Sequence, residues 1–343
     1  HPQRQLTDFI SAFRETETFG SEFSSFIEVF LEGLISNEGA PGKRKGALPS
    51  KKKKRTPSRR KVASVVPLDD DPMRKKAPAA NLVRQLKWGC GESLNVDQTI
   101  TCARVLCGII EDASKRAGTT NLLRQRQESL NQMGASAVAL AMVASENHKL
   151  YLAGLNLGVD LLAGGSWEVQ STMYGLLESG EVKALDGSGT TVFTRIRSAL
   201  RLSEREIHRR KAFLATQKMQ RDSFEEMTLG LSEATIEVFR RDLDAEFETL
   251  AHPCSLLCFL QRLCEGHYVE MQDLLHDQPN SKVSSSLVSD AALLLIELEA
   301  NLDEYVAEQA RLCCDLLVEV VQGNTTGVIA TVLSEFKLSE TLN

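Results

Sequence analysis

Residues 134–143 read Gly-Ala-Ser-Ala-Val-Ala-Leu-Ala-Met-Val, and this stretch decides the fold class. Its side chains are small and apolar on nearly every side of a helix, which predicts a helix buried among others. Apolar residues recur at helical spacing on both sides of the stretch. Further short helices are therefore expected at 95–118, 122–133, 150–163, 166–177 and 192–202.

Gly and Ser residues separate these expected helices. Asn95 to Gln98 resembles a capping box, the pair Gly164-Gly165 stops one helix, and Ser166 is expected to cap the next. Short helices around a very apolar member are typical of armadillo-like stacking, in which units of about 40–47 residues bury their faces on one another. No run alternates as a strand would, and aromatic residues make up only 6% of the chain. We therefore predict an all-α, armadillo-like helical solenoid.

Composition and periodicity divide the chain into six regions. The linker among them has too few large apolar residues to offset the entropy of ordering it. Because the sequence begins at His1 without a signal peptide, we expect it to start inside a longer protein. The regions are a short helical segment at 1–36, a disordered basic linker at 37–80, an armadillo-like block at 81–203, a charged connecting helix or link at 204–230, a second helical domain at 231–323 and a C-terminal tail at 324–343.

The net charge of −6 conceals an uneven distribution. Residues 43–61 carry eleven Lys and Arg and no acid, so the remainder holds 29 basic and 46 acidic residues. An acidic folded part argues against a nucleic-acid-binding fold. The basic run itself is read as a solvated linker, a nuclear-localisation signal or a patch for anionic lipid, and Ser58 and Ser64 beside it are candidate phosphorylation sites.

Most of the eight Cys lie in apolar, helix-like stretches, which favours free thiols in a reducing, cytosol-facing compartment. A zinc site made of Cys254, Cys258, Cys264 and His267 is conceivable, but the set lacks the paired Cys-x-x-Cys of structural zinc sites. The pair Cys313-Cys314 is interpreted either as small buried packing residues or as a redox-sensitive thiol site.

No catalytic constellation is present, so we do not expect an enzyme. The sequence has no Gly-x-Ser-x-Gly, no phosphate-binding Gly loop and no His-Glu-x-x-His, and Gly187-Ser-Gly189 is read as a turn. Trp88 and Trp167 are expected to be packing anchors. No apolar run approaches the roughly 20 residues that span a bilayer, so no membrane span is expected within this segment.

Three blocks resemble the inositol trisphosphate and ryanodine receptors. The helix–Gly-Gly–helix corner at 155–170 is similar to part of their armadillo region. Residues 259–275 closely resemble the start of the homology-associated domain, and 316–323 resemble a later helix end of that domain. The blocks occur in the family's order and span about half of the chain. After Gly323 the sequence departs from the family, which marks 324–343 as a divergent tail.

The resemblance implies a cytosolic regulatory solenoid of a calcium-release channel. Such a channel is a homotetramer in the endoplasmic reticulum membrane, and this segment would lie on the cytosolic face and contact other domains of the channel. The resemblance assigns Ca²⁺ to Glu265 and Glu319, which would supply half of a site whose other ligands lie elsewhere in the parent. The ligand-binding module and the pore are absent from this sequence. The alternative is a free-standing armadillo-like adaptor or scaffold.

Overall fold

The computed structural model describes residues 83, 96–115, 120–227, 252–278, 286–322 and 328–330. Within these ranges all regular structure is helical, which confirms the all-α prediction. The segments 1–36 and 37–80 and most of 324–343 lie outside the described residues. The helices are α4 (Val96–Lys115), α5 (Thr120–Gln132), α6 (Ala135–Val143), α7 (His148–Leu162), α8 (Trp167–Ser179), α9 (Val192–Met227), α11 (Pro253–Cys264), α12 (Val269–His276), α13 (Leu287–Glu299) and α14 (Ala307–Val321).

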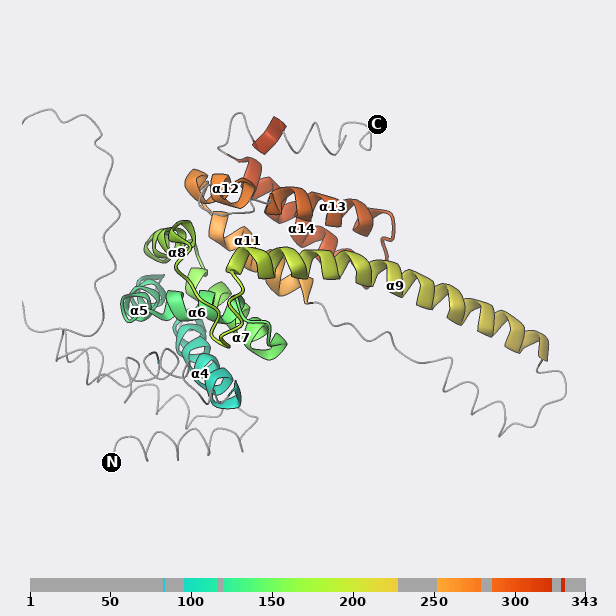
Figure 1. The fold of residues 1–343 in the computed structure, drawn as a ribbon, viewed down its shortest axis with the longest axis horizontal. Helices are drawn as coiled ribbons and strands as arrows, with labels where there is room; N and C mark the ends of the chain where they lie inside the picture. Colours follow the sequence, from blue (N-terminus) through green and yellow to red (C-terminus); the bar gives the residue numbers. More distant parts are fainter. Residues whose placement is uncertain are drawn as a thin grey trace, which may run out of the picture.

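The described helices from α5 onward form three stacked units of three helices each (Figure 1). The units are α5–α6–α7, α8–α9–α11 and α12–α13–α14. Their third helices α7, α11 and α14 stack in one row, which α4 extends beyond α7. Their second helices stack in another row, in the order α6, α9, α13. Each unit buries its faces on the next, as the armadillo-like prediction requires.

The buried stretch at 134–143 forms the centre of the first unit. α6 is apolar nearly all round and seven of its nine residues are buried, which confirms the expectation. Its close contact with α7 depends on Gly154, because a Cβ there would lie 2.7 Å from both Met142 Cβ and the Val143 backbone nitrogen. Asn147 opens α7, and its side chain accepts hydrogen bonds from the backbone of Lys149 and Leu150. By contrast, Ser166 precedes α8 but makes no side-chain capping bond.

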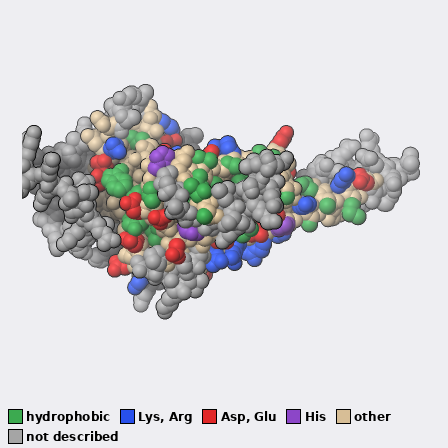
Figure 2. Space-filling model, turned by 90° about the horizontal axis from the view of Figure 1, so that it is seen from above, with side chains coloured by type: hydrophobic (Ala, Val, Ile, Leu, Met, Phe, Trp, Pro, Cys, Tyr) green, Lys and Arg blue, Asp and Glu red, His purple; other side chains and the backbone are tan. Residues whose placement is uncertain are grey.

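Helix α9 differs from the expectation of a short helix at 192–202 followed by a separate charged segment. It runs without a break from Val192 to Met227, through the boundary expected after 203. Ser203 does not break it, because its hydroxyl donates to the carbonyl of Ala199 within the same helix. α9 runs beside α13 and then projects beyond the other described helices (Figure 1). Figure 2 shows Lys and Arg side chains gathered along the lower edge of the middle of the molecule.

One continuous hydrophobic core runs from α4 to α14. The block at 81–203 and the domain at 231–323 therefore share their buried surface. Phe259 of α11 illustrates the contact: its ring is fully buried and occupies the space left by Gly158 of α7. Of the two expected anchors, Trp88 lies outside the described residues. Trp167 is half exposed and meets the Tyr268 ring edge-on, with 4.9 Å between the ring centroids.

None of the helices in the described ranges combines the length and the apolar character that crossing a bilayer requires.

Candidate functional site

A buried glutamine holds the end of the third helix in each unit. In the second unit, the side-chain amide of Gln170 on α8 donates to the carbonyls of Arg262 and Glu265 at 3.0 and 2.8 Å. The same arrangement, called here the glutamine clamp, occurs in the first and third units. There Gln127 donates to Asp160 and Ala163 at 3.0 and 2.8 Å, and Gln272 donates to Glu319 and Gln322 at 2.7 and 3.0 Å.

The clamp is needed because these helices end in an extended residue. Ala163, Glu265 and Gln322 have φ between −69° and −53° and ψ between 125° and 134°, so their carbonyls point away from the helical pattern. Carbonyls at a helix end have no partner in the helix, and leaving them unpaired in the interior costs free energy. The following residue is Gly in each case, and Gly164 and Gly266 have φ of 74° and 81°.

These clamped ends bring Glu265 and Glu319 to one corner. Glu265 is the last residue held by the Gln170 clamp, and Glu319 of α14 is the first residue held by the Gln272 clamp. The backbone N–H of Gly266 donates to the Glu319 carboxylate, and His267, at φ 61°, lies close enough to interact with it. The two residues singled out in the sequence therefore lie together, at the junction of two units.

The electrostatics of this corner disfavour ionised Glu319. Burial raises the pKa of Glu319, and the nearby Glu265 carboxylate raises it further, while His267 and the Gly266 N–H act in the opposite direction. Oε2 of Glu319 is buried and has no hydrogen-bond partner. Glu265 has a cation near it, since Arg262 Nη1 lies 3.5 Å from Glu265 Oε2.

Chemically, the corner offers oxygen donors to a hard cation. Two carboxylates present up to about four oxygens, whereas Ca²⁺ takes about six to eight. A cation held between Glu265 and Glu319 would need further ligands from outside this corner. The resemblance assigns these two residues to part of a calcium site.

The conceivable zinc site is not assembled. Cys254, Cys258, Cys264 and His267 do not form a donor cluster. Among the described residues, the one group of His, Cys, Asp or Glu side chains close enough to share an ion is Glu204, His208 and Glu297. Cys264 is fully buried, and burial raises the pKa of its thiol.

The pair Cys313-Cys314 is divided between two environments. Cys313 is buried, its pKa is raised to about 12 by burial, and its thiol points at the Ala291 carbonyl. Cys314 is exposed. The two thiols therefore do not form a matched redox pair.

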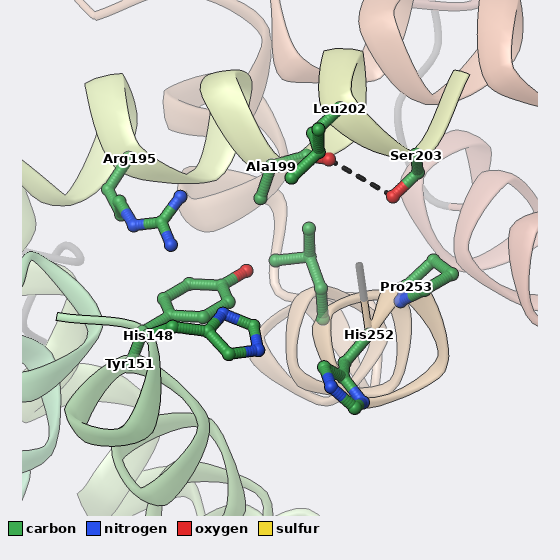
Figure 3. Close-up of a pocket in the computed structure, with 9 residues that line it drawn as sticks. His148, Tyr151, Arg195, Ala199, Leu202, Ser203, His252 and Pro253 are labelled. Atoms are coloured by element: carbon green, nitrogen blue, oxygen red, sulfur yellow. Dashed lines mark hydrogen bonds between the residues drawn. The ribbon is translucent and has the colours of Figure 1, made fainter. Parts of the chain in front are cut away.

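A small pocket lies where α7, α9 and α11 meet (Figure 3). The His148 and His252 rings lie 5.1 Å apart, and the Arg195 guanidinium stacks over the Tyr151 ring at 4.2 Å. The pocket's one serine, Ser203, donates its hydroxyl to the Ala199 carbonyl, as the dashed line shows. This bond engages the serine in its own helix and leaves no activated nucleophile.

Sequence reasoning missed the three glutamines of the clamps. Gln127 and Gln170 are about 43 positions apart, which is one armadillo-like repeat, and each lies on the first helix of its unit. This spacing was the available signal. A buried glutamine is hard to recognise, because Gln is normally a surface residue.

Comparison with known families identifies the C-terminal part of the chain. Residues 247–340 match the family described as RyR and IP3R Homology associated. The matched range contains α11 to α14, and with them Glu265, Glu319 and the Gln272 clamp.

Proposed function

We propose that this chain, which carries the homology-associated domain of the ryanodine and inositol trisphosphate receptors at residues 247–340, is part of the regulatory helical solenoid of such a calcium-release channel. The continuous core supports a role in transmission. Because α7 and α11 share buried surface, a displacement at the homology-associated domain would move the armadillo-like block as well. The parent would be a homotetramer in the endoplasmic reticulum membrane, with this segment on its cytosolic face.

The observation that carries the proposal is the carboxylate corner of Glu265 and Glu319. Both side chains lie at clamped helix ends, so their backbone positions are fixed before any ion arrives. One oxygen of Glu319 is buried without a partner, which is a costly arrangement unless a cation completes it. Within this chain the corner would bind Ca²⁺ weakly, because it supplies too few oxygens.

The mechanism follows from the charges. Calcium would neutralise the repulsion between Glu265 and Glu319 and would favour closure of the corner on the channel part that supplies the remaining ligands. Gln170 on α8 and Gln272 on α12 donate to the backbone carbonyls of Glu265 and Glu319, so closure would shift whole helices. Such a shift can bias the gate only if the stack has two discrete arrangements.

The test is calcium activation of a channel that contains this segment. We expect the double change Glu265→Gln and Glu319→Gln to move activation to at least about tenfold higher calcium, which corresponds to a loss of about 1.4 kcal/mol of binding. Unchanged calcium activation in this double variant would contradict the proposal.

The matched control is Glu308→Gln with Asp315→Asn. It also removes two negative charges, and both of these acids are ion-paired to Arg311 on the outer surface of α14. This control should activate like the parent. If it shifts equally, the effect reflects net charge and not a site.

A further inference from the structure

A second group of potential metal-binding side chains lies between α9 and α13, away from the carboxylate corner of Glu265 and Glu319. Glu204 and His208 are four residues apart on α9, and Glu297 faces them from α13. Their potential ligand atoms all lie within 4.8 Å of one another. His208 Nε2 lies 3.2 Å from Glu297 Oε2. Two ligands about 2.0–2.1 Å from one tetrahedral zinc ion are themselves about 3.3 Å apart, so this separation already suits a shared ion.

The charges at this position differ from those on the rest of the same interface. Nearer the start of both helices, Arg197 and Arg201 face Asp290 at 3.3 and 3.6 Å. Beyond the end of α13, Asp303 pairs with Arg210 of α9.

Between these pairs, two carboxylates face each other across the helices. Within the described ranges, Glu204 and Glu297 form no ion pair with a Lys or Arg. The side chain that neighbours both of them is His208. Two facing carboxylates repel each other, and a bound dication would remove that repulsion.

We propose that Glu204, His208 and Glu297 bind a first-row transition-metal dication, with Zn²⁺ as the physiological ion. An imidazole nitrogen with two carboxylate oxygens suits zinc, whereas calcium and magnesium prefer all-oxygen sites. Three protein ligands leave the fourth tetrahedral position for water.

A bound ion would link the long helix α9 to the homology-associated domain. α9 contributes two ligands and α13 the third, so a bound ion fastens the first half of α9 onto α13. His208 is half exposed, so an ion can enter from solvent without unfolding. This inference does not depend on the calcium proposal, because it uses different residues and a different class of metal.

The experiment titrates the full 343-residue chain with Zn²⁺ and, as a spectroscopic probe, with Co²⁺. The free cysteines are other potential ligands, so the number of bound equivalents is compared between variants. Cobalt on thiolate gives strong near-ultraviolet charge-transfer bands that a nitrogen–oxygen site does not give. We expect Glu204→Gln with Glu297→Gln, and separately His208→Asn, to lose one bound equivalent or to weaken it at least about tenfold.

The matched control is Glu299→Gln with Glu304→Gln, two exposed acids at and beyond the end of α13. It removes the same charge and should keep the full number of equivalents. Circular dichroism verifies that every variant remains helical. The proposal is wrong if both the Glu204→Gln/Glu297→Gln variant and the His208→Asn variant bind as many Zn²⁺ ions as the parent, with equal affinity.

A second measurement does not depend on counting ions. Zn²⁺ should slow backbone hydrogen exchange in the first half of α9 and in α13 of the parent and the control, and should leave the exchange of the triad variants unchanged. If Zn²⁺ does not slow exchange in the parent, the proposed zinc link between α9 and α13 is wrong. It is equally wrong if Zn²⁺ slows exchange to the same extent in the variants of Glu204, His208 and Glu297. Millimolar Ca²⁺ should neither displace Zn²⁺ nor reproduce the slowing; if it does, the site is a general cation site.

Discussion

The corner between α7 and α11 and the corner between α11 and α14 are built alike but carry different side chains. Each has a glutamine clamp, an extended C-cap residue and a following Gly. At the α11/α14 corner the two facing positions are Glu265 and Glu319. At the α7/α11 corner the equivalent positions are Ala163 and Arg262.

Comparing the two corners distinguishes the residues that helix stacking requires from those that it does not require. Both corners keep the glutamine, because helix-end carbonyls must be satisfied wherever units stack. The α7/α11 corner carries Ala163 and Arg262 at these positions, so a pair of carboxylates is not a requirement of the architecture. Burial raises the pKa of Glu319, which shows that its carboxylate is held against an electrostatic cost. Such a cost is typical of functional positions.

The largest expected effect is the loss of a clamp. Gln170→Leu or Gln272→Leu keeps the side-chain size but leaves two buried carbonyls unpaired, at about 1–3 kcal/mol for each group. We expect each substitution to lower the free energy of unfolding by about 2–4 kcal/mol, measured by urea denaturation. The control Gln309→Leu, at a half-buried position of α14, should change it by less than about 0.5 kcal/mol. Clamp variants no less stable than this control would show that the two corners do not depend on the clamp.

A smaller effect is expected from a substitution that disturbs the α7/α11 contact and leaves the α11/α14 corner unchanged. A Cβ in Gly158→Ala would lie 2.5 and 2.8 Å from two carbons of the Phe259 ring, and this ring is fully buried. We expect overpacking to lower the free energy of unfolding by about 1–3 kcal/mol. Backbone hydrogen exchange should be accelerated more in α7 than in α14. Phe259→Leu in the same chain should recover part of the loss, because the two positions are in direct contact. Strictly additive effects would show that the contact between α7 and α11 is not what Gly158 protects.

The smallest effect concerns the pH dependence of the carboxylate corner. The folded-state pKa of Glu319 is raised, so the ionised form is disfavoured by folding at neutral pH. Without calcium, Glu319→Gln should therefore increase the thermal midpoint at neutral pH. The increase should disappear as the pH falls through the raised pKa, where Glu319 itself becomes neutral.

Glu308 on the same helix provides a comparison of opposite sign. Its hydrogen bonds with Arg311 lower its pKa, so Glu308→Gln should slightly decrease the midpoint at neutral pH, and this small loss should vanish in acid. Both variants are followed by circular dichroism between about pH 2 and 8, because the lowered pKa of Glu308 places the loss of its contribution in strong acid. A decrease for Glu319→Gln at neutral pH would contradict the reasoning about the corner.

Much of the fold was predictable from the sequence, and the exceptions have physical reasons. The expected helix ends agree closely with α5 to α8, and the Gly164-Gly165 corner has positive φ at both residues. A boundary was expected within α9, after residue 203, because the charged segment at 204–230 resembles a solvated connecting helix or a link. Its helix nevertheless continues, and ion pairs from Arg197 and Arg201 to Asp290 fasten its first half to α13.

The candidate sites were less predictable. Glu265 and Glu319 were recognised through resemblance and not from their own pattern. Glu204 and His208 have the i, i+4 spacing of a metal-binding pair, but nothing in the sequence connects them to Glu297. The clamp glutamines have no local signal, because each bonds to carbonyls of a different helix.

The sequence by itself determined where the helices form, which helix is buried and where glycine turns the chain. These properties depend on neighbours within one or two turns, whose periodicity can be read directly. Only the tertiary structure decided which helix ends meet, and therefore which side chains form the carboxylate corner and the Glu204–His208–Glu297 group. Stacking brings together residues that are distant along the chain, and this arrangement arises from the shared core and not from any local pattern.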